Sequence, residues 1–226
     1  MISVAIDGPA GAGKSTLSRR LAQSLGYIYV DTGAMYRAVG LKLIRAGLSC
    51  DSLDEKRVSE ILETTKVDIS YEDGAQVVKL DGENVNGFIR TPEASMMASK
   101  CSALPVVRAF LLDMQRSLAR ENSVVMDGRD IATVVLPDAE VKIFLTASVD
   151  ARAKRRYDEL VLKDDKITLE EVTADVIKRD YNDTHRAIAP LKPSETSVIV
   201  DTTELSFEES LEALKQTVKN VLEGAN

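Results

Sequence analysis

The sequence predicts an α/β fold in which helices cover both faces of a mainly parallel, doubly wound sheet. A short apolar run at residues 2–6 ends in Asp7 and is followed at once by the glycine-rich segment GPAGAGKST (8–16). Stretches of helical periodicity alternate with further short apolar runs, at 27–30, 123–127, 141–147 and 197–201. Strands that alternate with helices in this way build parallel sheets that are buried on both faces.

Length and composition fit one globular domain with a small insert. The chain has 226 residues, and single domains run from about 100 to 250 residues. Its formal net charge of -7 disfavours nucleic acid and anionic membranes as partners, because a polyanion needs a basic surface. The longest stretch without a charged residue, 21–30, is shorter than the about 20 apolar residues that cross a bilayer. We therefore expect a cytoplasmic protein.

The cysteines and the histidine give no sign of a metal or disulfide framework. Cys50, Cys101 and the single histidine, His185, are too few and too scattered for a zinc site. We expect buried or incidental thiols, and we expect His185 to be a loop residue rather than a catalyst.

Three helices are expected before the chain changes character. Helical periodicity from Lys14 onward predicts the first. The second covers TGAMYRAVGLKLIRAG (32–47) and stops at Gly47, since glycine is a common helix C-terminal residue. The third is expected to start at a capping box formed by Ser52 and Glu55.

The pattern changes between 67 and 90, where apolar and polar residues alternate. Turn signals stand at Asp73-Gly74 and at Asp81-Gly82. Alternation interrupted by Asp-Gly pairs is typical of β-hairpins. We therefore expect a small inserted β-type unit in this segment.

Helices are expected again in the second half of the chain. The segment 91–121 is helical with a break at Pro105. A helix begins near Asp150, and capping boxes at 168–171 and 206–209 predict two more helix starts. Five apolar residues of the last helix share one face and should form a core stripe. They are Phe207, Leu211, Leu214, Val218 and Leu222.

The segment from Gly8 to Ser15 matches G-x-x-x-x-G-K-[ST] between an expected strand and an expected helix, the context of a P-loop NTPase. In such a loop the backbone amides surround phosphates, Lys14 reaches the β and γ phosphates of ATP, and Ser15 offers its hydroxyl to Mg²⁺. The expected ATP-binding residues are Gly8, Pro9, Ala10, Gly11, Ala12, Gly13, Lys14, Ser15 and Thr16. The alternative is a glycine-rich turn with an exposed lysine.

The loop does not identify the acceptor, because switches, motors and kinases all contain it. No N-K-x-D motif follows, which disfavours a GTPase switch. Arginines near expected loops and strand ends favour transfer between two phosphate groups, since a guanidinium group binds phosphate oxygens in pairs. They are Arg37, Arg108, Arg129, Arg152, Arg155, Arg156, Arg179 and Arg186. For any one of these arginines taken alone, a solvated surface ion pair is the more common explanation.

Several segments in a fixed order carry a resemblance to a known family. They are DGPAGAGKST (7–16), DTGAMYRAV (31–39), IRTPEASMMAS (89–99), PVVRAFLLDMQR (105–116), DGRDIATVVLPDA (127–139), RRY (155–157), and RDYNDTHRAIAPLKP (179–193) followed by VIVDTT (198–203). Along nearly its whole length the chain resembles the bacterial-type cytidylate kinases, which are P-loop nucleoside monophosphate kinases. It departs from them at Ala132, where the family usually has glycine after GRDI.

The resemblance implies one kinase domain over 1–226 that acts as a monomer on ATP and CMP, and also on dCMP, with Mg²⁺ as cofactor. It implies a nucleoside-monophosphate-binding region near 33–100, which includes the insert near 67–90. It also implies a short lid near 150–168, whose arginines Arg155 and Arg156 fold over ATP. For Arg152, on the same helix, a charged helix face is the alternative.

For the acceptor phosphate, the resemblance implies that Arg37, Arg129 and Arg186 hold the phosphate of CMP. It implies that Thr32 and Tyr36 line the same pocket. The expected catalytic residues are Lys14, Arg129, Arg155, Arg156 and Arg186.

For the nucleoside, the resemblance implies that Ser99, Arg108 and Asp130 read the cytosine edge and that Arg179 and Asp183 hold the sugar. Base-pair chemistry agrees for Asp130, because a carboxylate accepts a hydrogen bond from the exocyclic amine of cytosine, where uracil presents an oxygen. The alternative for Asp130 is a helix N-cap or an ion pair with the neighbouring arginine.

Asp127 follows an expected strand in a place like that of a Walker B carboxylate. It either orients waters on Mg²⁺ or has a structural role. No general base is required, because the second pKa of a phosphate monoester is about 6 and the acceptor oxygen is already ionised. Two alternatives stay open at this point: another small-acceptor kinase, of the UMP or shikimate type, and a nucleotide-dependent binding switch.

Overall fold

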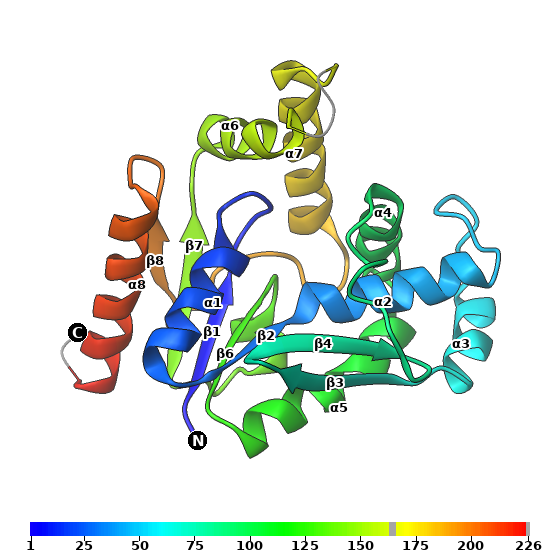
Figure 1. Ribbon diagram of the computed structural model, residues 1–226, viewed down its shortest axis with the longest axis horizontal. Coiled ribbons are helices and arrows are strands. Elements are labelled where there is room, and N and C mark those ends of the chain that lie inside the picture. The colour runs from blue at the N-terminus through cyan, green and yellow to red at the C-terminus, as the bar shows by residue number, and fades with distance from the viewer. Residues whose placement is uncertain (163–165, 225–226) are drawn as a thin grey trace.

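The structure, a computed structural model, describes residues 1–162 and 166–224. Residues 163–165 of the expected lid lie outside the described residues. The centre is a sheet of five strands in the order β2-β6-β1-β7-β8, and every pairing in it is parallel (Figure 1). The strands are β1 (Ser3–Asp7), β2 (Ile28–Asp31), β6 (Val124–Gly128), β7 (Val141–Thr146) and β8 (Val198–Asp201). The predicted parallel sheet is confirmed.

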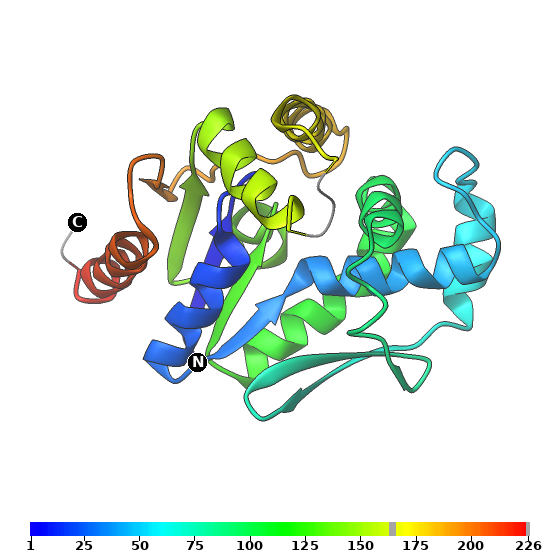
Figure 2. The same ribbon diagram turned by 45° about the horizontal axis from the view of Figure 1, so that its top comes forward.

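Eight helices flank the two sheets in the part of the chain that is described. They are α1 (Lys14–Leu25), α2 (Thr32–Arg45), α3 (Glu55–Glu63), α4 (Pro92–Cys101), α5 (Pro105–Glu121), α6 (Val149–Leu160), α7 (Leu169–His185) and α8 (Phe207–Leu222). Figure 1 shows α6 and α7 above the loop that joins β1 to α1. Figure 2 shows α8 on one side of the central sheet and α2, α3 and α4 on the other.

The strands of the central sheet are buried on both faces. In β1, Ala5 belongs to one hydrophobic cluster, and Val4 and Ile6 belong to a second. The second cluster also contains Leu21 of α1 and Leu214 of α8. Successive side chains of a strand point to opposite faces, so one strand supplies both cores. This two-sided burial is what the continuous apolar runs of the sequence predict.

No single helix among residues 1–162 and 166–224 is long and apolar enough to cross a membrane. Helices α4 and α5 reach that length and composition only as a pair, and the chain bends by 100° between them. The free cysteines are half-buried Cys50 and buried Cys101, as expected.

Two of the three expected capping boxes are confirmed, at 168–171 and at 206–209. The box expected at Ser52 is wrong. Helix α3 begins after Asp54, whose carboxylate accepts a hydrogen bond from the Arg57 amide at 2.9 Å. Asp54 stands directly before the first helical residue, so its carboxylate reaches an unpaired amide of the first turn that Ser52 does not.

The stripe expected on α8 is buried only in its middle. Leu214 and Val218 are buried, whereas Phe207 and Leu222 at the two ends are 38% and 42% exposed. A helix of 16 residues is about 24 Å long. The strands beneath it have four to six residues and measure about 13 to 20 Å. The ends of the helix therefore project beyond the sheet.

The expected insert is a separate antiparallel sheet of three strands. They are β3 (Val67–Glu72), β4 (Ala75–Leu80) and β5 (Glu83–Asn84). Both connecting turns fall where predicted: Asp73, Gly74, Asp81 and Gly82 all have positive φ. Two consecutive residues with positive φ give the tight turn that matches the twist of paired strands.

Candidate active site

The phosphate loop runs from the end of β1 to the start of α1. Gly8, Gly11 and Gly13 have φ values of 152°, 77° and 84°, which favour glycine. A side chain at Gly8 would lie 1.9 Å from the carbonyl oxygen of Leu145 on β7, and one at Gly11 would lie 3.2 Å from Cβ of Arg152. The glycines therefore let the loop lie against β7 and α6, and all nine expected ATP-binding residues lie in this loop or in the first turn of α1.

Lys14 and Ser15 begin α1 and lie beside a buried carboxylate. Lys14 Nζ donates to the carbonyl oxygen of Pro9 at 2.6 Å, across the loop. Asp127 of β6 accepts from Ser15 Oγ at 2.8 Å and from Tyr29 Oη at 3.0 Å. Burial lowers the pKa of Lys14, and the positive charge of a nearby arginine lowers it further. An anion bound in the loop would favour the charged lysine again.

The donor atoms beside Lys14 fit Mg²⁺. Ser15 and Asp127 supply a hydroxyl and a carboxylate oxygen within 2.8 Å of each other, and hard oxygen ligands are those that Mg²⁺ prefers. No group of three or more His, Cys, Asp or Glu residues in the described ranges is arranged to hold a metal ion by itself. A pair of this kind suits an ion that takes its other ligands from phosphate and water.

Asp130 is the centre of a second, buried cluster. One oxygen of its carboxylate pairs with Arg108 of α5, and the other accepts from Arg186 Nη2 at 3.2 Å. All three side chains are at most 10% exposed. Asp130 stands at the N-cap position of the turn that follows it, but its side chain makes no capping hydrogen bond, and it pairs with Arg108 and Arg186 rather than with Arg129.

The backbone after Asp130 forms a π-helical turn, η1 (Ile131–Val135), which the sequence analysis did not predict. Asp7, the last residue of β1, binds its start: the two carboxylate oxygens accept from the amides of Ile131 and Ala132 at 2.7 and 2.8 Å. Burial raises the pKa of Asp7 to about 6, and the two amides oppose that rise. Asp7 thus connects the strand before the phosphate loop to the segment that carries Asp130.

Arg129, Arg179 and Asp183 lie together beside this cluster. Arg129 Nε donates to Asp183 at 2.7 Å. Burial lowers the pKa of Arg179, and the charge of Arg129 lowers it further, while Asp175 and Asp183 oppose the effect. The structure thus brings together three residues that the sequence analysis assigned to the acceptor.

Arg37 and Tyr36 stand on the first turns of α2. Arg37 Nη2 donates to Asp31 at 3.1 Å, whereas its Nε is buried and has no hydrogen-bond partner in the described protein. Burial raises the pKa of Tyr36 to about 12. The charge of Asp130 adds to this rise, whereas the charges of Arg108 and Arg186 oppose it. Tyr36 therefore lies at the Asp130 cluster.

Thr32 and Ser99 are the two remaining residues that the sequence analysis assigned to the acceptor. Thr32 begins α2 and donates to the backbone oxygen of Asp127 at 2.8 Å. Ser99 is half-buried on α4.

The expected lid arginines do not meet the phosphate loop in this conformation. Arg155 donates to the backbone and side-chain oxygens of Thr202, and Arg156 pairs with Glu159 on the surface. Arg152 is the arginine of α6 that reaches the loop: it donates to the carbonyl oxygen of Ala10 at 3.0 Å and pairs with Asp180 of α7.

Sequence reasoning missed several residues that position the site. Their only signals are local: Asp7 directly precedes the glycine-rich motif, and Asp180 lies beside Arg179 within RDYND. The positioning residues that it missed are Asp7, Tyr29, Asp31 and Asp180.

Comparisons with known proteins agree with this geometry. The family model described as Cytidylate kinase matches residues 4–220. A cytidylate kinase of Caldicellulosiruptor bescii is 50% identical over 221 residues, which cover 98% of this chain and 97% of that protein. A cytidylate kinase of Carboxydothermus hydrogenoformans is 48% identical over 215 residues, or 95% and 96% of the two chains. Among solved structures, an uncharacterized protein from Eubacterium ventriosum shares the fold, with a TM-score of 0.51 at 10% identity over 97% of this chain and 99% of that one.

Proposed function

This chain belongs to the cytidylate kinase family, and we propose that it is the enzyme that transfers the γ-phosphoryl group of ATP to CMP, giving ADP and CDP. The observation that carries the proposal is the buried Asp130 carboxylate between Arg108 and Arg186. Asp7, at the end of the strand that leads into the phosphate loop, binds the amides of Ile131 and Ala132, the two residues that follow Asp130. The position of Asp130 relative to the phosphate loop is therefore fixed by the hydrogen bonds of Asp7.

Asp130 selects the base in this proposal. Its carboxylate accepts a hydrogen bond from the exocyclic amine of cytosine, whereas the oxygen of uracil at that position would repel it. Arg108 and Arg186 orient the Asp130 carboxylate, since each pairs with one of its oxygens. Ser99 completes the base site, and Arg179 with Asp183 holds the sugar.

Arg37, Arg129 and Arg186 hold the phosphate of CMP in this proposal. The unpartnered Nε of Arg37 leaves a buried donor for an anion. Arg129 lies on the segment between Asp127 of the donor side and Asp130 of the acceptor side. Several positive charges around two phosphate groups lower the repulsion between them, so positioning and charge neutralisation carry the reaction and no general base is needed.

On the donor side, the loop amides and Lys14 hold the β and γ phosphates of ATP. Ser15, with Asp127 through water, would hold Mg²⁺, which supplies charge neutralisation on the phosphate oxygens when it is bound. Arg155 and Arg156 of α6 complete the donor site when α6 and α7 close over it, and such closure excludes water and limits ATP hydrolysis.

The proposal extends to dCMP, because CMP and dCMP share the cytosine and the phosphate and differ only in the 2′-hydroxyl of the sugar. It also includes a monomer, since one chain supplies every residue of the proposed site. Two free thiols fit the reducing cytoplasm.

The test is a steady-state panel in which CMP, dCMP, UMP, AMP and shikimate are each offered with MgATP and ADP release is followed. We expect CMP and dCMP to raise ADP release sharply and the other three to do so weakly. A reaction without acceptor measures background hydrolysis. ADP release that is slow and indifferent to every acceptor would contradict the proposal and favour a nucleotide-dependent switch.

A further inference from the structure

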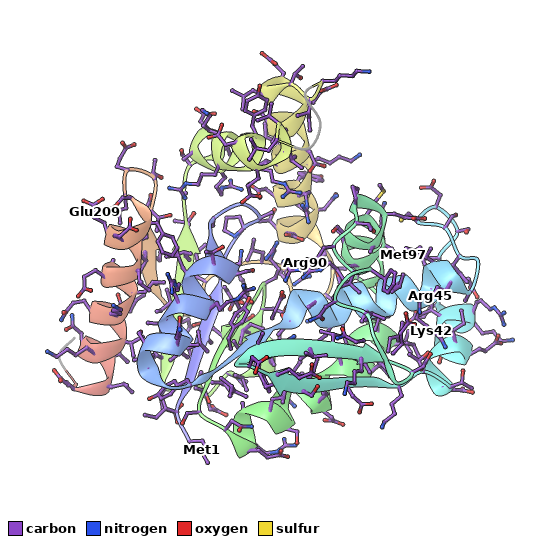
Figure 3. All side chains as sticks on the ribbon, in the orientation of Figure 1. Met1, Lys42, Arg45, Arg90, Met97 and Glu209 are labelled. Carbon is purple, nitrogen blue, oxygen red and sulfur yellow. The ribbon has the colours of Figure 1, made fainter. Side chains whose placement is uncertain are left out.

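Besides its apolar packing against α2, the inserted sheet makes polar side-chain contacts near both ends of that helix, and the first is an exposed pair of ion pairs. Near the C-terminal end of α2, Lys42 pairs with Asp81 and Arg45 pairs with Glu83, each at 2.6 Å. Figure 3 shows Lys42 and Arg45 close together at this end of the helix. The four side chains are 24% to 47% exposed, and ion pairs of this kind contribute little to structure.

The second contact is made to backbone at the other end of α2. The Gln76 side chain of β4 accepts from the Asp31 amide at 2.8 Å and donates to the Asp31 carbonyl oxygen at 3.2 Å. Tyr71 of β3 donates to the carbonyl oxygen of Tyr29 at 3.1 Å. Strand β2 is an edge of the central sheet, so Gln76 pairs its last backbone groups as a neighbouring strand would.

Asp31 links the inserted sheet to the acceptor site, because its backbone binds Gln76 and its side chain binds Arg37. Its carboxylate caps α2 by accepting from the Ala34 amide at 2.9 Å, and it binds Arg37 Nη2 at 3.1 Å. The same carboxylate lies 3.9 Å from Arg90, just before α4, which Figure 3 labels near the start of α2. The position of the Asp31 backbone therefore sets the direction of the Arg37 guanidinium.

We propose that Gln76 is a positioning residue for the acceptor phosphate: it fixes Asp31, and through Asp31 it orients Arg37 toward the phosphate of CMP. The inference rests on the proposed function, in which Arg37 binds that phosphate. Gln76 would therefore connect the inserted sheet to the binding of CMP and not to the binding of ATP. The donor loop is held instead by β7 and α6, which Gln76 does not touch.

The first experiment compares Gln76→Ala with Glu83→Gln, which removes the charge of one exposed ion pair of the same insert. In steady-state assays with CMP and MgATP varied in turn, Gln76→Ala should raise the KM for CMP about fivefold, because two hydrogen bonds to Asp31 are lost. In Gln76→Ala the KM for ATP should change by less than about twofold. Glu83→Gln should change neither the KM for CMP nor the KM for ATP. Gln76→Met, which keeps the length of the side chain but loses both hydrogen bonds, should raise the KM for CMP by a similar factor and decides the matter if Gln76→Ala does not fold.

A double-mutant cycle then separates positioning from general loosening of the fold. If Gln76 acts through Arg37, the Gln76→Ala/Arg37→Ala double variant should have the same KM for CMP as Arg37→Ala alone. A further rise of about fivefold in the double variant would overturn the inference. So would an unchanged KM for CMP in Gln76→Ala while the native chain phosphorylates CMP. Failure of the native chain to phosphorylate CMP would instead contradict the proposed function itself.

Discussion

The donor side and the acceptor side of the site are built in opposite ways. The phosphate loop is one continuous segment at the end of β1, and its conformation is fixed by glycines that lie against β7 and α6. The acceptor side gathers Arg108 from α5, Asp130 from the turn after β6, and Arg186 from the end of α7. The donor side can therefore be recognised as a motif, whereas the acceptor side exists only once these elements have packed together.

The two sides meet at Asp7. It precedes Gly8 directly, and it holds the amides of Ile131 and Ala132, which follow Asp130. Thr32 is a second link, because it donates to the backbone oxygen of Asp127. Away from Asp7 and Thr32, a change at one side should leave the other intact. Variants of the two sides test that independence.

Lys14→Ala should have the largest effect. The variant lacks the charge that neutralises the transferring phosphoryl group, and we expect phosphoryl transfer to fall about 1,000-fold. CMP binding, measured by titration calorimetry, should persist, because the acceptor residues lie on other elements. Lys219→Ala, which removes an exposed lysine of α8, should be as active as the native chain. Near-native transfer in Lys14→Ala would refute its assignment to the donor side.

Asp130→Asn should have the next largest effect and should act on the acceptor alone. The variant presents an amide donor where cytosine also donates, and it leaves Arg108 and Arg186 without an anionic partner. We expect kcat/KM for CMP to fall about 100-fold and the preference for CMP over UMP to narrow. The KM for ATP should stay near its native value.

The control for this variant is its own thermal unfolding, because an unpaired buried charge costs about 3 to 5 kcal/mol. Assays below the unfolding transition separate lost recognition from lost structure. An unchanged ratio of CMP to UMP turnover in folded Asp130→Asn would remove Asp130 from base selection.

Asp7→Asn should have a moderate effect that reaches the acceptor through η1. The asparagine keeps one acceptor oxygen, but its amino group faces a backbone amide that is also a donor. We expect the KM for CMP to rise about tenfold and the preference for CMP over UMP to narrow. Asp138→Asn, an exposed position after η1, serves as control. A larger change in the KM for ATP than in that for CMP would place Asp7 on the donor side.

The sequence predicted the fold well because its signals are local. Apolar runs, capping boxes and Asp-Gly turns each depend on a few neighbouring residues, and nearly all of them lie where expected. The exceptions are also local. Asp54 rather than Ser52 caps α3. The π-helical turn at 131–135 is too short to show a periodic pattern in the sequence.

The candidate site was predicted less completely because the hydrogen bonds that hold its residues in place join segments far apart in the sequence. The bonds from Asp7 to Ile131 and from Gln76 to Asp31 join residues 124 and 45 positions apart. No spacing rule relates such pairs: Asp7 meets Ile131 because β1 and β6 are neighbours in the central sheet, and Gln76 meets Asp31 because the inserted sheet lies beside β2. The same holds for Arg152, which reaches the phosphate loop because α6 follows the strand next to β1.

Tyr29→Phe should have the smallest effect and should stay on the donor side. Tyr29 donates to one oxygen of Asp127 while Ser15 donates to the other. Loss of the hydroxyl frees one carboxylate oxygen to turn, so we expect the Mg²⁺ concentration for half-maximal activity to rise about threefold. The ring remains to pack beside Arg19, and the backbone oxygen that accepts from Tyr71 is unchanged.

The matched control is Tyr27→Phe, which removes a hydroxyl from the half-buried residue just before β2. It should leave the Mg²⁺ dependence as it is. In Tyr29→Phe, the KM for CMP and the preference for CMP over UMP should equal those of the native chain, because Asp127 faces Ser15 and not the Asp130 cluster. If the preference for CMP over UMP narrows in Tyr29→Phe instead, the donor and acceptor sides are coupled through β6. That result would contradict their expected independence.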